Sequence, residues 1–173
     1  MTSARTVVLL VMHGIPPRDF PPQELSEFFM LHTRLERATG TERDHMLERY
    51  SALESKMRGW PRTPQNDPFF AASQEMAAGL SKATGYEVAT AYNEFCAPDV
   101  EEALTQVAAR GAGQIIALTP MLTQGGEHAD VEIPALLKEF QAAHPSVSVV
   151  YAWPFDTAHV AKFLAEQVKR FVK

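Results

Sequence analysis

The sequence predicts an α/β fold in which helices flank a parallel, four-stranded sheet. Two apolar runs without polar alternation, residues 6–12 (TVVLLVM) and 114–119 (QIIALT), are typical of strands that are buried on both faces. Weaker runs occur at 87–92 (EVATAY) and 147–152 (VSVVYA), and helical patterns lie between them. Strands that alternate with helices indicate βαβ units, which build parallel sheets.

Two helices are predicted from apolar stripes that follow a plausible first turn. Residues 98–109 carry such a stripe, and Pro98 suits the first turn of a helix. Residues 131–142 form the second pattern, with Asp130 in front as a plausible N-cap.

Two further helices are predicted with one face toward the sheet. In residues 67–83, helical spacing turns Phe69, Met76 and Leu80 inward. Residues 159–172 follow the last strand, and we expect their apolar stripe to face the sheet. That stripe consists of Val160, Phe163, Leu164 and Val168.

Residues 16–66 do not fit the alternation of strands and helices. They open with IPPRDFPP and contain two amphipathic stretches separated by Thr39-Gly40-Thr41, a pattern of helix stop and N-cap. The segment therefore predicts a helical hairpin inserted after the first strand. We expect residues 1–173 to form a single α/β domain with this insertion at 16–66.

Composition excludes several classes of function. The chain has 173 residues, a net charge of −5 and a pI near 5.7, which argues against a general nucleic-acid binder. The apolar stretch Val7–Met12 is too short to span a bilayer and lacks a signal-peptide pattern, so we expect a cytoplasmic protein without membrane contact. Cys96 is the only cysteine, which excludes an internal disulfide, and we expect it to be a small buried hydrophobe.

Two histidines follow predicted strands. His13 ends VVLLVMHG, and His128 lies in the glycine-bearing loop of TPMLTQGGEH. The carboxyl ends of parallel strands line the binding crevice of an open sheet, so both imidazoles are expected at one edge. A single histidine there would most simply hold a loop by a hydrogen bond. Two of them favour a shared site for a divalent metal ion.

Glu94 is the candidate carboxylate of the same site. It lies between Tyr92 and Phe95, just after the strand at 87–92, although a lone loop glutamate is usually only solvated. Two histidines and one carboxylate leave coordination positions open, which suits a metal that is bound and then released. Glu127 and Glu132 add carboxylates around His128, but Glu132 fits helix-start chemistry better than metal ligation.

Motifs for nucleotides and for serine hydrolysis are absent from the sequence. There is no GxGxxG, GxxxxGK[ST] or GxSxG pattern, so no nucleotide cofactor is expected. In the string MHG, Met12 occupies the position at which a histidine phosphatase has the arginine that binds phosphate. Phosphatase activity is therefore a poor fit to this sequence.

Three motifs together resemble the class II tetrapyrrole chelatases, in particular the sirohydrochlorin cobaltochelatase and ferrochelatase family in its short, CbiX-like type. They are LLVMHG, YNEFCAPDVEEAL and TPMLTQGGEHADVEIP, and the similarity covers residues 6–14 and about 67–172. The third motif is fairly specific, whereas HG alone is weak. The chain departs from the family pattern where Ile15 and two prolines follow HG, and in the insertion at 16–66.

The resemblance implies ATP-independent insertion of Co²⁺ or Fe²⁺, with Ni²⁺ also suitable, into a sirohydrochlorin-type tetrapyrrole in cobalamin or siroheme biosynthesis. By that likeness His13, Glu94 and His128 are both the metal ligands and the catalytic set. A histidine would remove pyrrole protons, and Glu94 and Glu127 would carry them away. The resemblance also implies a homodimer, since one such domain is half of a two-domain chelatase.

Several residues are candidates for binding the macrocycle. Arg58 and Arg62 of the RGWPR segment offer guanidinium groups to its carboxylates, and Trp60 offers a ring for stacking. An equally good interpretation makes Trp60 the anchor of a surface hairpin. Gly125 and Gly126 would let the backbone approach a flat ligand.

Two other functions compete with the chelatase. A metal or tetrapyrrole carrier on the same fold would bind without accelerating insertion. An α/β scaffold whose hairpin recruits a protein partner would show no metal affinity.

Overall fold

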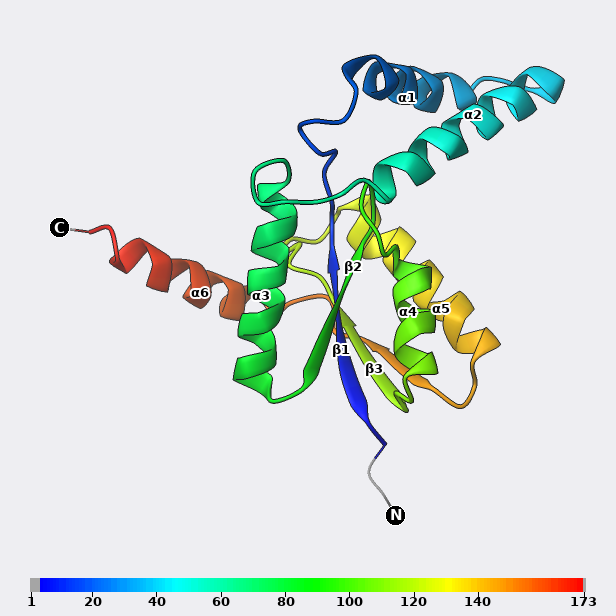
Figure 1. Cartoon of the computed structure of the whole chain (residues 1–173). Helices are drawn as coiled ribbons and strands as arrows, with labels where there is room; N and C mark the ends of the chain where they lie inside the picture. The colour runs from blue at the N-terminus through cyan, green and yellow to red at the C-terminus, as the bar shows by residue number, and fades with distance from the viewer. Residues whose placement is uncertain (1–3, 173) are drawn as a thin grey trace.

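The computed structural model describes residues 4–172 and contains a parallel sheet in the strand order β2-β1-β3-β4. The strands are β1 (Thr6–Met12), β2 (Glu87–Tyr92), β3 (Gln114–Leu118) and β4 (Ser148–Tyr151). The predicted α/β class and the four strands are confirmed. The last two strands are slightly shorter than the sequence pattern indicated (Figure 1).

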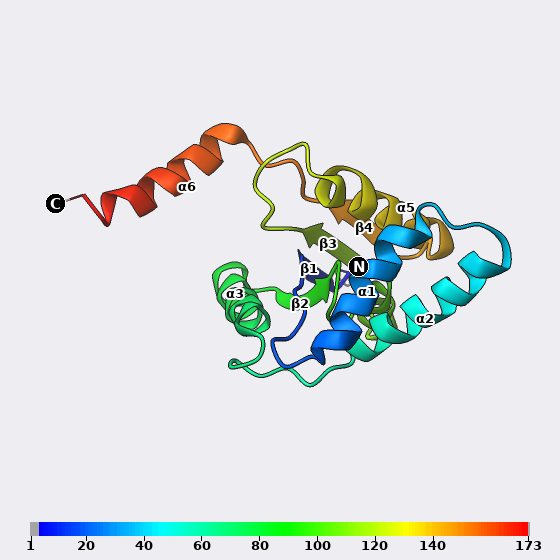
Figure 2. The same cartoon turned by 90° about the horizontal axis from the view of Figure 1, so that it is seen from above.

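Helices cover both faces of the sheet, but not equally. On one face α4 (Val100–Ala109) and α5 (Ile133–Ala143) pack over the strands and build the main hydrophobic core. On the other face α3 (Pro68–Thr84) packs against the β2 side of the sheet (Figure 2).

Strand β1 lies in the middle of these layers. Val7, Leu9 and Val11 point into the core under α4 and α5, whereas Leu10 and Met12 point toward α3. All six apolar residues of Val7–Met12 are buried, which is why the run carries no polar alternation. Cys96 is buried in the smaller core under α3, as expected of a structural cysteine.

The predicted insertion is a helical hairpin with a core of its own. Helices α1 (Pro22–Leu35) and α2 (Gly40–Arg58) pack on each other around Phe28, Leu31, Leu53 and Met57. The ion pairs Glu27–Arg49 and Glu24–Lys56 join the two helices on their solvent side. Gly40, expected to stop the first helix, is instead the first residue of α2, and Thr39 precedes it as the N-cap residue.

Three predicted helix starts are wrong by two or three residues, and one of them is that of the last helix, which begins at Thr157 and not at residue 159. Helix α4 begins at Val100, not Pro98, because Asp99 and Glu102 form a capping box that closes the first turn. The helix predicted from 131 begins earlier, with the π-helix η1 (His128–Glu132) that runs into α5. Asp130 is therefore inside η1, where its carboxylate accepts a hydrogen bond from the Gly125 amide rather than capping the helix.

Two predicted apolar faces are not covered by the sheet. Met76 of α3 is exposed, because Ser73 and Ala77 instead form the buried face of that helix. Helix α6 (Thr157–Lys169) extends away from the sheet on the side of α3, and none of its residues is buried (Figures 1 and 2). No helix in the described part of the chain has both the length and the apolar character that crossing a lipid bilayer requires.

Candidate metal centre

The carboxyl ends of β1 and β2 bring two of the predicted ligands together. The parallel pairing of these strands reaches Met12 and Tyr92. Beyond it the backbone N–H of Asn93 donates to the Met12 carbonyl at 2.8 Å, and the backbone N–H of Glu94 donates to the His13 carbonyl at 2.8 Å. The two loops thus continue the ladder by one step, and that step places Glu94 beside His13.

Gly14 permits this close approach of the loops. Its φ is +95°, and a Cβ atom at this position would lie 1.9 Å from the Glu94 carbonyl oxygen. Any side chain would clash with that backbone and would also disfavour the conformation. The HG motif therefore has a structural reason: the glycine lets the histidine and the glutamate lie together.

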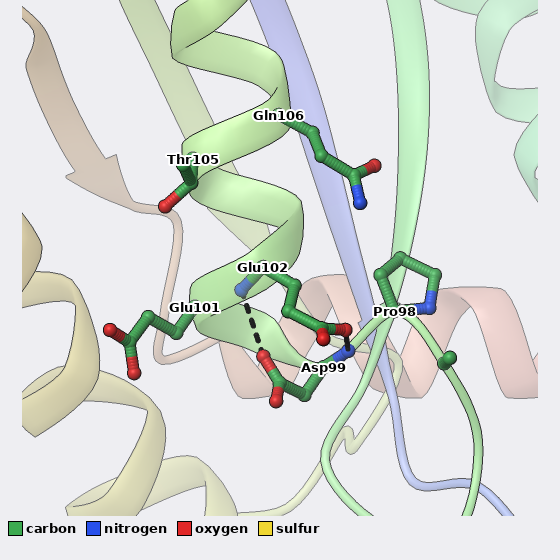
Figure 3. A pocket seen from close by; sticks show the side chains of 7 residues that line it. Pro98, Asp99, Glu101, Glu102, Thr105 and Gln106 are labelled. Carbon is green, nitrogen blue, oxygen red and sulfur yellow. Dashed lines mark hydrogen bonds between the residues drawn. The ribbon is translucent and has the colours of Figure 1, made fainter. Parts of the chain in front are cut away.

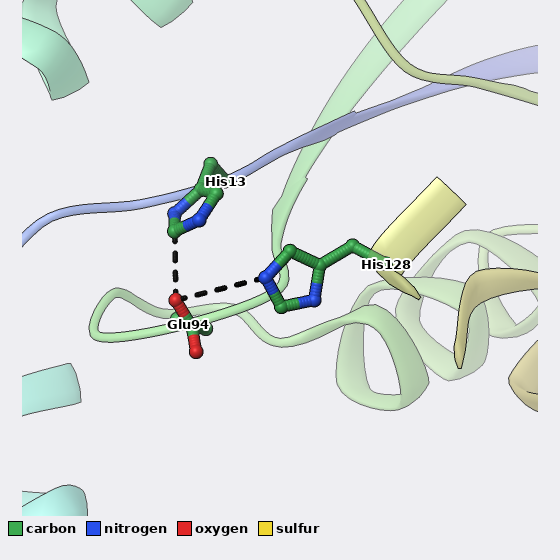
Figure 4. A group of neighbouring side chains, drawn as sticks. All are labelled: His13, Glu94 and His128. Atoms are coloured by element: carbon green, nitrogen blue, oxygen red, sulfur yellow. Dashed lines mark ion pairs between the residues drawn. The ribbon is translucent and has the colours of Figure 1, made fainter. Parts of the chain in front are cut away.

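His128 completes a cluster of three potential ligands (Figure 4). Glu94 Oε2 lies 3.4 Å from His13 Nδ1 and 4.0 Å from His128 Nε2. One ligand atom from each residue lies within 4.8 Å of the others, and the two imidazole rings meet edge to face with their centroids 4.9 Å apart. The structure thus brings the three residues from separate loops to one edge of the sheet, in a spacing that could hold a metal ion.

Hydrogen-bond acceptors indicate which nitrogen each ring offers to a ligand. His128 Nδ1 lies 2.6 Å from Glu132 Oε2, and His13 Nδ1 lies 2.9 Å from the Gly14 carbonyl oxygen. A carbonyl or an ionised carboxylate can only accept, which favours the hydrogen on Nδ1 of both rings, while Asn93 Nδ2 also lies 2.6 Å from His128 Nδ1 and Glu94 Oε2 lies 3.4 Å from His13 Nδ1. In this tautomer Nε2 carries the lone pair with which a neutral imidazole binds a metal.

Glu132 orients His128, a role that the sequence analysis missed. Burial raises the pKa of Glu132, but hydrogen bonds from His128 and from Asn93 Nδ2, at 2.8 Å, lower it more, so the net pKa is below the ordinary value. Carboxylates that accept from the distal nitrogen of a metal-binding histidine fix its orientation and strengthen it as a ligand. The spacing of four residues places both on one helix face, whereas a helix that begins at residue 131 leaves His128 outside it and gives Glu132 only helix-start chemistry. No sequence signal indicated Asn93.

Arg62 is not available to a substrate carboxylate. Its side chain is 5% exposed and pairs at 2.6 Å with Asp67, which is 1% exposed. Its guanidinium also donates to the carbonyls of Ile15 and Phe95, one in each of the two site loops. Arg62 therefore holds the two loops in place instead of binding the macrocycle, because every group that its guanidinium contacts belongs to the protein.

Arg58 reaches only the loop after β2 and borders a cavity. It donates to the carbonyl of Asn93 at 3.1 Å and of Cys96 at 2.9 Å, and it pairs with Glu54 within α2. Trp60 lies at the base of the hairpin, where Nε1 donates to Asp19 at 3.0 Å and the ring packs edge to face on Phe20. This geometry corresponds to the anchoring interpretation of the tryptophan.

A cavity of about 200 Å³ lies between the hairpin and the cluster of His13, Glu94 and His128 (the candidate metal site). Glu94, Asn93 and Glu132 form its wall on the sheet side, and Arg58 borders it as well. The hairpin contributes the remaining side chains together with Phe95 of the β2 loop: Phe28, Phe29, His32, Tyr50 and Glu54. The insertion therefore builds an aromatic wall directly beside the candidate ligands.

The glycine loop before His128 borders the cluster on another side. Gly125 adopts a φ of +96° and donates to Asp130, and a Cβ atom at Gly125 or Gly126 would meet nothing within 4 Å. Glu127 is exposed and directly precedes η1. The backbone of this loop is thus open to a ligand.

A larger hollow of about 570 Å³ lies away from the metal cluster, at the start of α4 (Figure 3). Two of its three carboxylates are used by the helix itself, and Glu101 is the third. Asp99 accepts from the Glu102 amide at 2.8 Å, and Glu102 accepts from the Asp99 amide at 3.1 Å. We therefore assign no binding role to this surface despite its size.

Comparison with known proteins points to one family. The model of the family CbiX matches residues 63–171, which is 109 of 173 residues. No curated protein sequence matches the chain. The fold is similar to that of a CbiX protein from Marinobacter aquaeolei VT8, described as a cobalamin (vitamin B12) biosynthesis protein. The two are 14% identical with a TM-score of 0.52, over 95% of this chain and 98% of the other.

Two longer proteins resemble the chain more distantly. One is SirB from Bacillus subtilis with Fe³⁺, at 16% identity and a TM-score of 0.47. The other is the sirohydrochlorin chelatase SirB from Bacillus subtilis subspecies spizizenii in complex with cobalt, at 15% identity and a TM-score of 0.44. Each match covers 87% of this chain but only 40% and 43% of the respective SirB chains.

Proposed function

The chain belongs to the CbiX family, and from this premise we propose that it is a chelatase that inserts Co²⁺ or Fe²⁺ into a sirohydrochlorin-type tetrapyrrole without ATP. The product would serve cobalamin or siroheme biosynthesis. The observation that carries the proposal is the convergence of His13, Glu94 and His128 at the edge of the sheet.

The ligand set suits a metal that is a substrate and must leave again. Two imidazole nitrogens and one carboxylate oxygen bind Co²⁺, Fe²⁺ and Ni²⁺ and leave positions open for ring nitrogens. Such a site can hand its ion to an incoming macrocycle as pyrrole nitrogens replace protein ligands one at a time. All three side chains retain solvent exposure, which allows the ion to enter.

Insertion also requires bases. A free-base tetrapyrrole loses two N–H protons as the divalent ion enters, so the site must accept protons from the ring. Glu94 and the histidine released from the metal are within reach of the same point and can accept them. The hydrogen bond from His128 Nδ1 to Glu132 stabilises the imidazolium that forms.

The macrocycle would lie over the candidate metal site and against the hairpin. The aromatic side chains of Phe29 and Tyr50 border the cavity there, and Arg58 can meet a peripheral carboxylate from its rim. Gly125 and Gly126 leave room for the edge of a flat ring on the opposite side. A carrier that binds metal or tetrapyrrole on the same fold is the alternative, and it would use the same contacts without accelerating insertion.

The test is the absorbance change of sirohydrochlorin on mixing with Co²⁺ or Fe²⁺, with and without the protein. We expect a rate above background, and His13→Ala and His128→Ala should each lower it by about 10²- to 10⁴-fold, the usual contribution of a positioned base. His45→Ala, an exposed histidine on α2, is the matched control and should keep the wild-type rate. Binding of metal or macrocycle without acceleration would select the carrier, and absence of both would refute the proposal.

A further inference from the structure

Helix α6 carries an apolar stripe that nothing in the described chain covers. Phe163 is 65% exposed, Leu164 51% and Val168 61%, and they share one face because of their helical spacing. The opposite face carries Lys162 and Lys169. A surface helix with this pattern normally buries its apolar face against another element.

The sheet has a matching uncovered area. The register aligns Val8, Ile116 and Val150 in one row across β1, β3 and β4, on the face that α3 covers. Along this row Val8 is 4% exposed, Ile116 is partly buried and Val150 is 45% exposed. Helix α3 therefore covers the β2 and β1 side only, and the face over β3 and β4 is apolar and open.

The open area continues onto α3. Gln74 of this helix donates to Thr90 and Tyr92 of the edge strand β2, so this flank of α3 faces that edge. Met76, which is exposed, and Leu80, which is partly buried, lie on the other flank, toward β3. A helix placed over β3 and β4 would thus touch Met76 and Leu80 as well as the strands.

The linker directs α6 away from its own sheet. After β4, the Ala152 amide donates to the Ala117 carbonyl at 2.8 Å, and Trp153 Nε1 donates to Asp130 at 2.9 Å. Asp156 then caps the helix by accepting from the His159 amide. These contacts hold the chain up to the first turn of α6, from which the helix projects outward (Figures 1 and 2).

The accessible surface is larger than that of a compact monomer. It amounts to 10845 Å². A compact protein of this mass exposes about 8,400 Å² by the usual scaling. The excess is about 2,400 Å² per chain, and a dimer in which each copy buried half of it would bury about 2,400 Å² in total, which is within the range of obligate homodimers. Helix α6 is one of the elements that protrude from the sheet (Figures 1 and 2).

We propose that the chain forms a two-fold dimer by exchange of α6. The helix of each copy lies across β3 and β4 of the other copy, beside its α3, and buries Phe163 and Leu164 against Ile116 and Val150. The same helix face and the same sheet face are used in both directions, so the contact is self-complementary and closes with two chains. This inference is independent of the chelatase activity.

The first experiment measures the mass of the full chain in solution by light scattering after size exclusion. We expect twice 19.2 kDa for the wild type. The double variant Phe163→Ser/Leu164→Ser should halve that mass, while circular dichroism shows an intact fold because both side chains are exposed within one copy. Lys162→Ser, on the opposite face of α6, is the matched control and should leave the mass unchanged.

The second experiment decides whether α6 reaches its own sheet or that of a partner. The variant Val150→Cys/Phe163→Cys is oxidised, remaining thiols are alkylated, and the product is separated without reductant. Exchange predicts a covalent dimer, whereas a helix that folds back predicts a cross-linked monomer. A monomeric wild type, a cross-linked monomer, or a dimer that survives Phe163→Ser/Leu164→Ser would each overturn the proposal.

Discussion

Hydrogen-bond acceptors lie beside Nδ1 of both imidazoles of the candidate site. Glu132 Oε2 lies 2.6 Å from His128 Nδ1 and the Gly14 carbonyl oxygen lies 2.9 Å from His13 Nδ1, which favours the tautomer whose Nε2 can bind a metal. The lowered pKa of Glu132, which its hydrogen bonds with His128 and Asn93 produce against the effect of burial, keeps this carboxylate ionised through neutral pH. The orientation of His128 is therefore held by contacts within the protein.

We expect Glu132→Gln to weaken Co²⁺ binding by about 10- to 100-fold, the usual effect of losing a carboxylate that orients a metal-binding histidine. Titration calorimetry at neutral pH measures this affinity. Glu127→Gln, an exposed neighbour, is the matched control and should bind as the wild type does. Equal affinities of the two variants would remove Glu132 from the proposed mechanism.

Arg62 could pair with a substrate carboxylate by its chemistry, but the fold uses it to hold two loops together. Its guanidinium pairs with buried Asp67 and holds the carbonyls of both site loops. Arginine is preferred for such buried, multidentate contacts because its planar fork satisfies several acceptors at once.

Arg62→Met is predicted to destabilise the protein by about 3–5 kcal/mol, because it leaves the Asp67 carboxylate buried without its partner. Urea unfolding monitored by tryptophan fluorescence gives this free energy. Arg110→Met, which removes an exposed ion pair with Glu87, should cost about 1 kcal/mol or less. Similar losses in both variants would contradict the buried role.

At the scale of elements, the inserted hairpin changes what the edge of the sheet can bind. Helices α1 and α2 have their own apolar core and place Phe29 and Tyr50 in the cavity beside the candidate metal site. Tyr50 also stacks on Phe28, with ring centroids 4.6 Å apart, which holds its ring at the cavity. In the proposed function the hairpin would form a wall for a flat ligand, and it supplies none of the three candidate metal ligands.

Phe29→Ala and Tyr50→Ala should each reduce affinity for sirohydrochlorin by about 2- to 10-fold, the effect of one lost aromatic contact. Affinity for Co²⁺ should not change. Fluorescence quenching by the tetrapyrrole measures the first quantity and calorimetry the second. Leu47→Ala, on an exposed part of α2, is the control. A parallel loss of metal affinity would show that the hairpin has a different role.

At the scale of the whole molecule, helix exchange would tie stability to protein concentration. A dimer that dissociates on unfolding is stabilised by mass action, so its Tm rises as the protein becomes more concentrated. We expect this rise for the wild type and a constant Tm for Phe163→Ser/Leu164→Ser. Scanning calorimetry over a hundredfold range of concentration measures it. A constant Tm for both proteins would argue against exchange.

The sequence by itself determined the elements and the edge at which the ligands meet. The unbroken apolar character of residues 6–12 reflects burial on both faces of β1, and parallel strands deliver His13, Glu94 and His128 to one edge. These features depend on local periodicity and on strand direction, which neighbouring residues specify.

Only the tertiary structure decided what each side chain meets. It placed Glu132 under His128, enclosed Arg62 with Asp67, and left the stripe of α6 and Met76 uncovered. An apolar stripe indicates that a face must be buried, but its covering depends on the path of distant segments. Likewise an arginine or glutamate shows only its charge in the sequence, and the fold selects its partner.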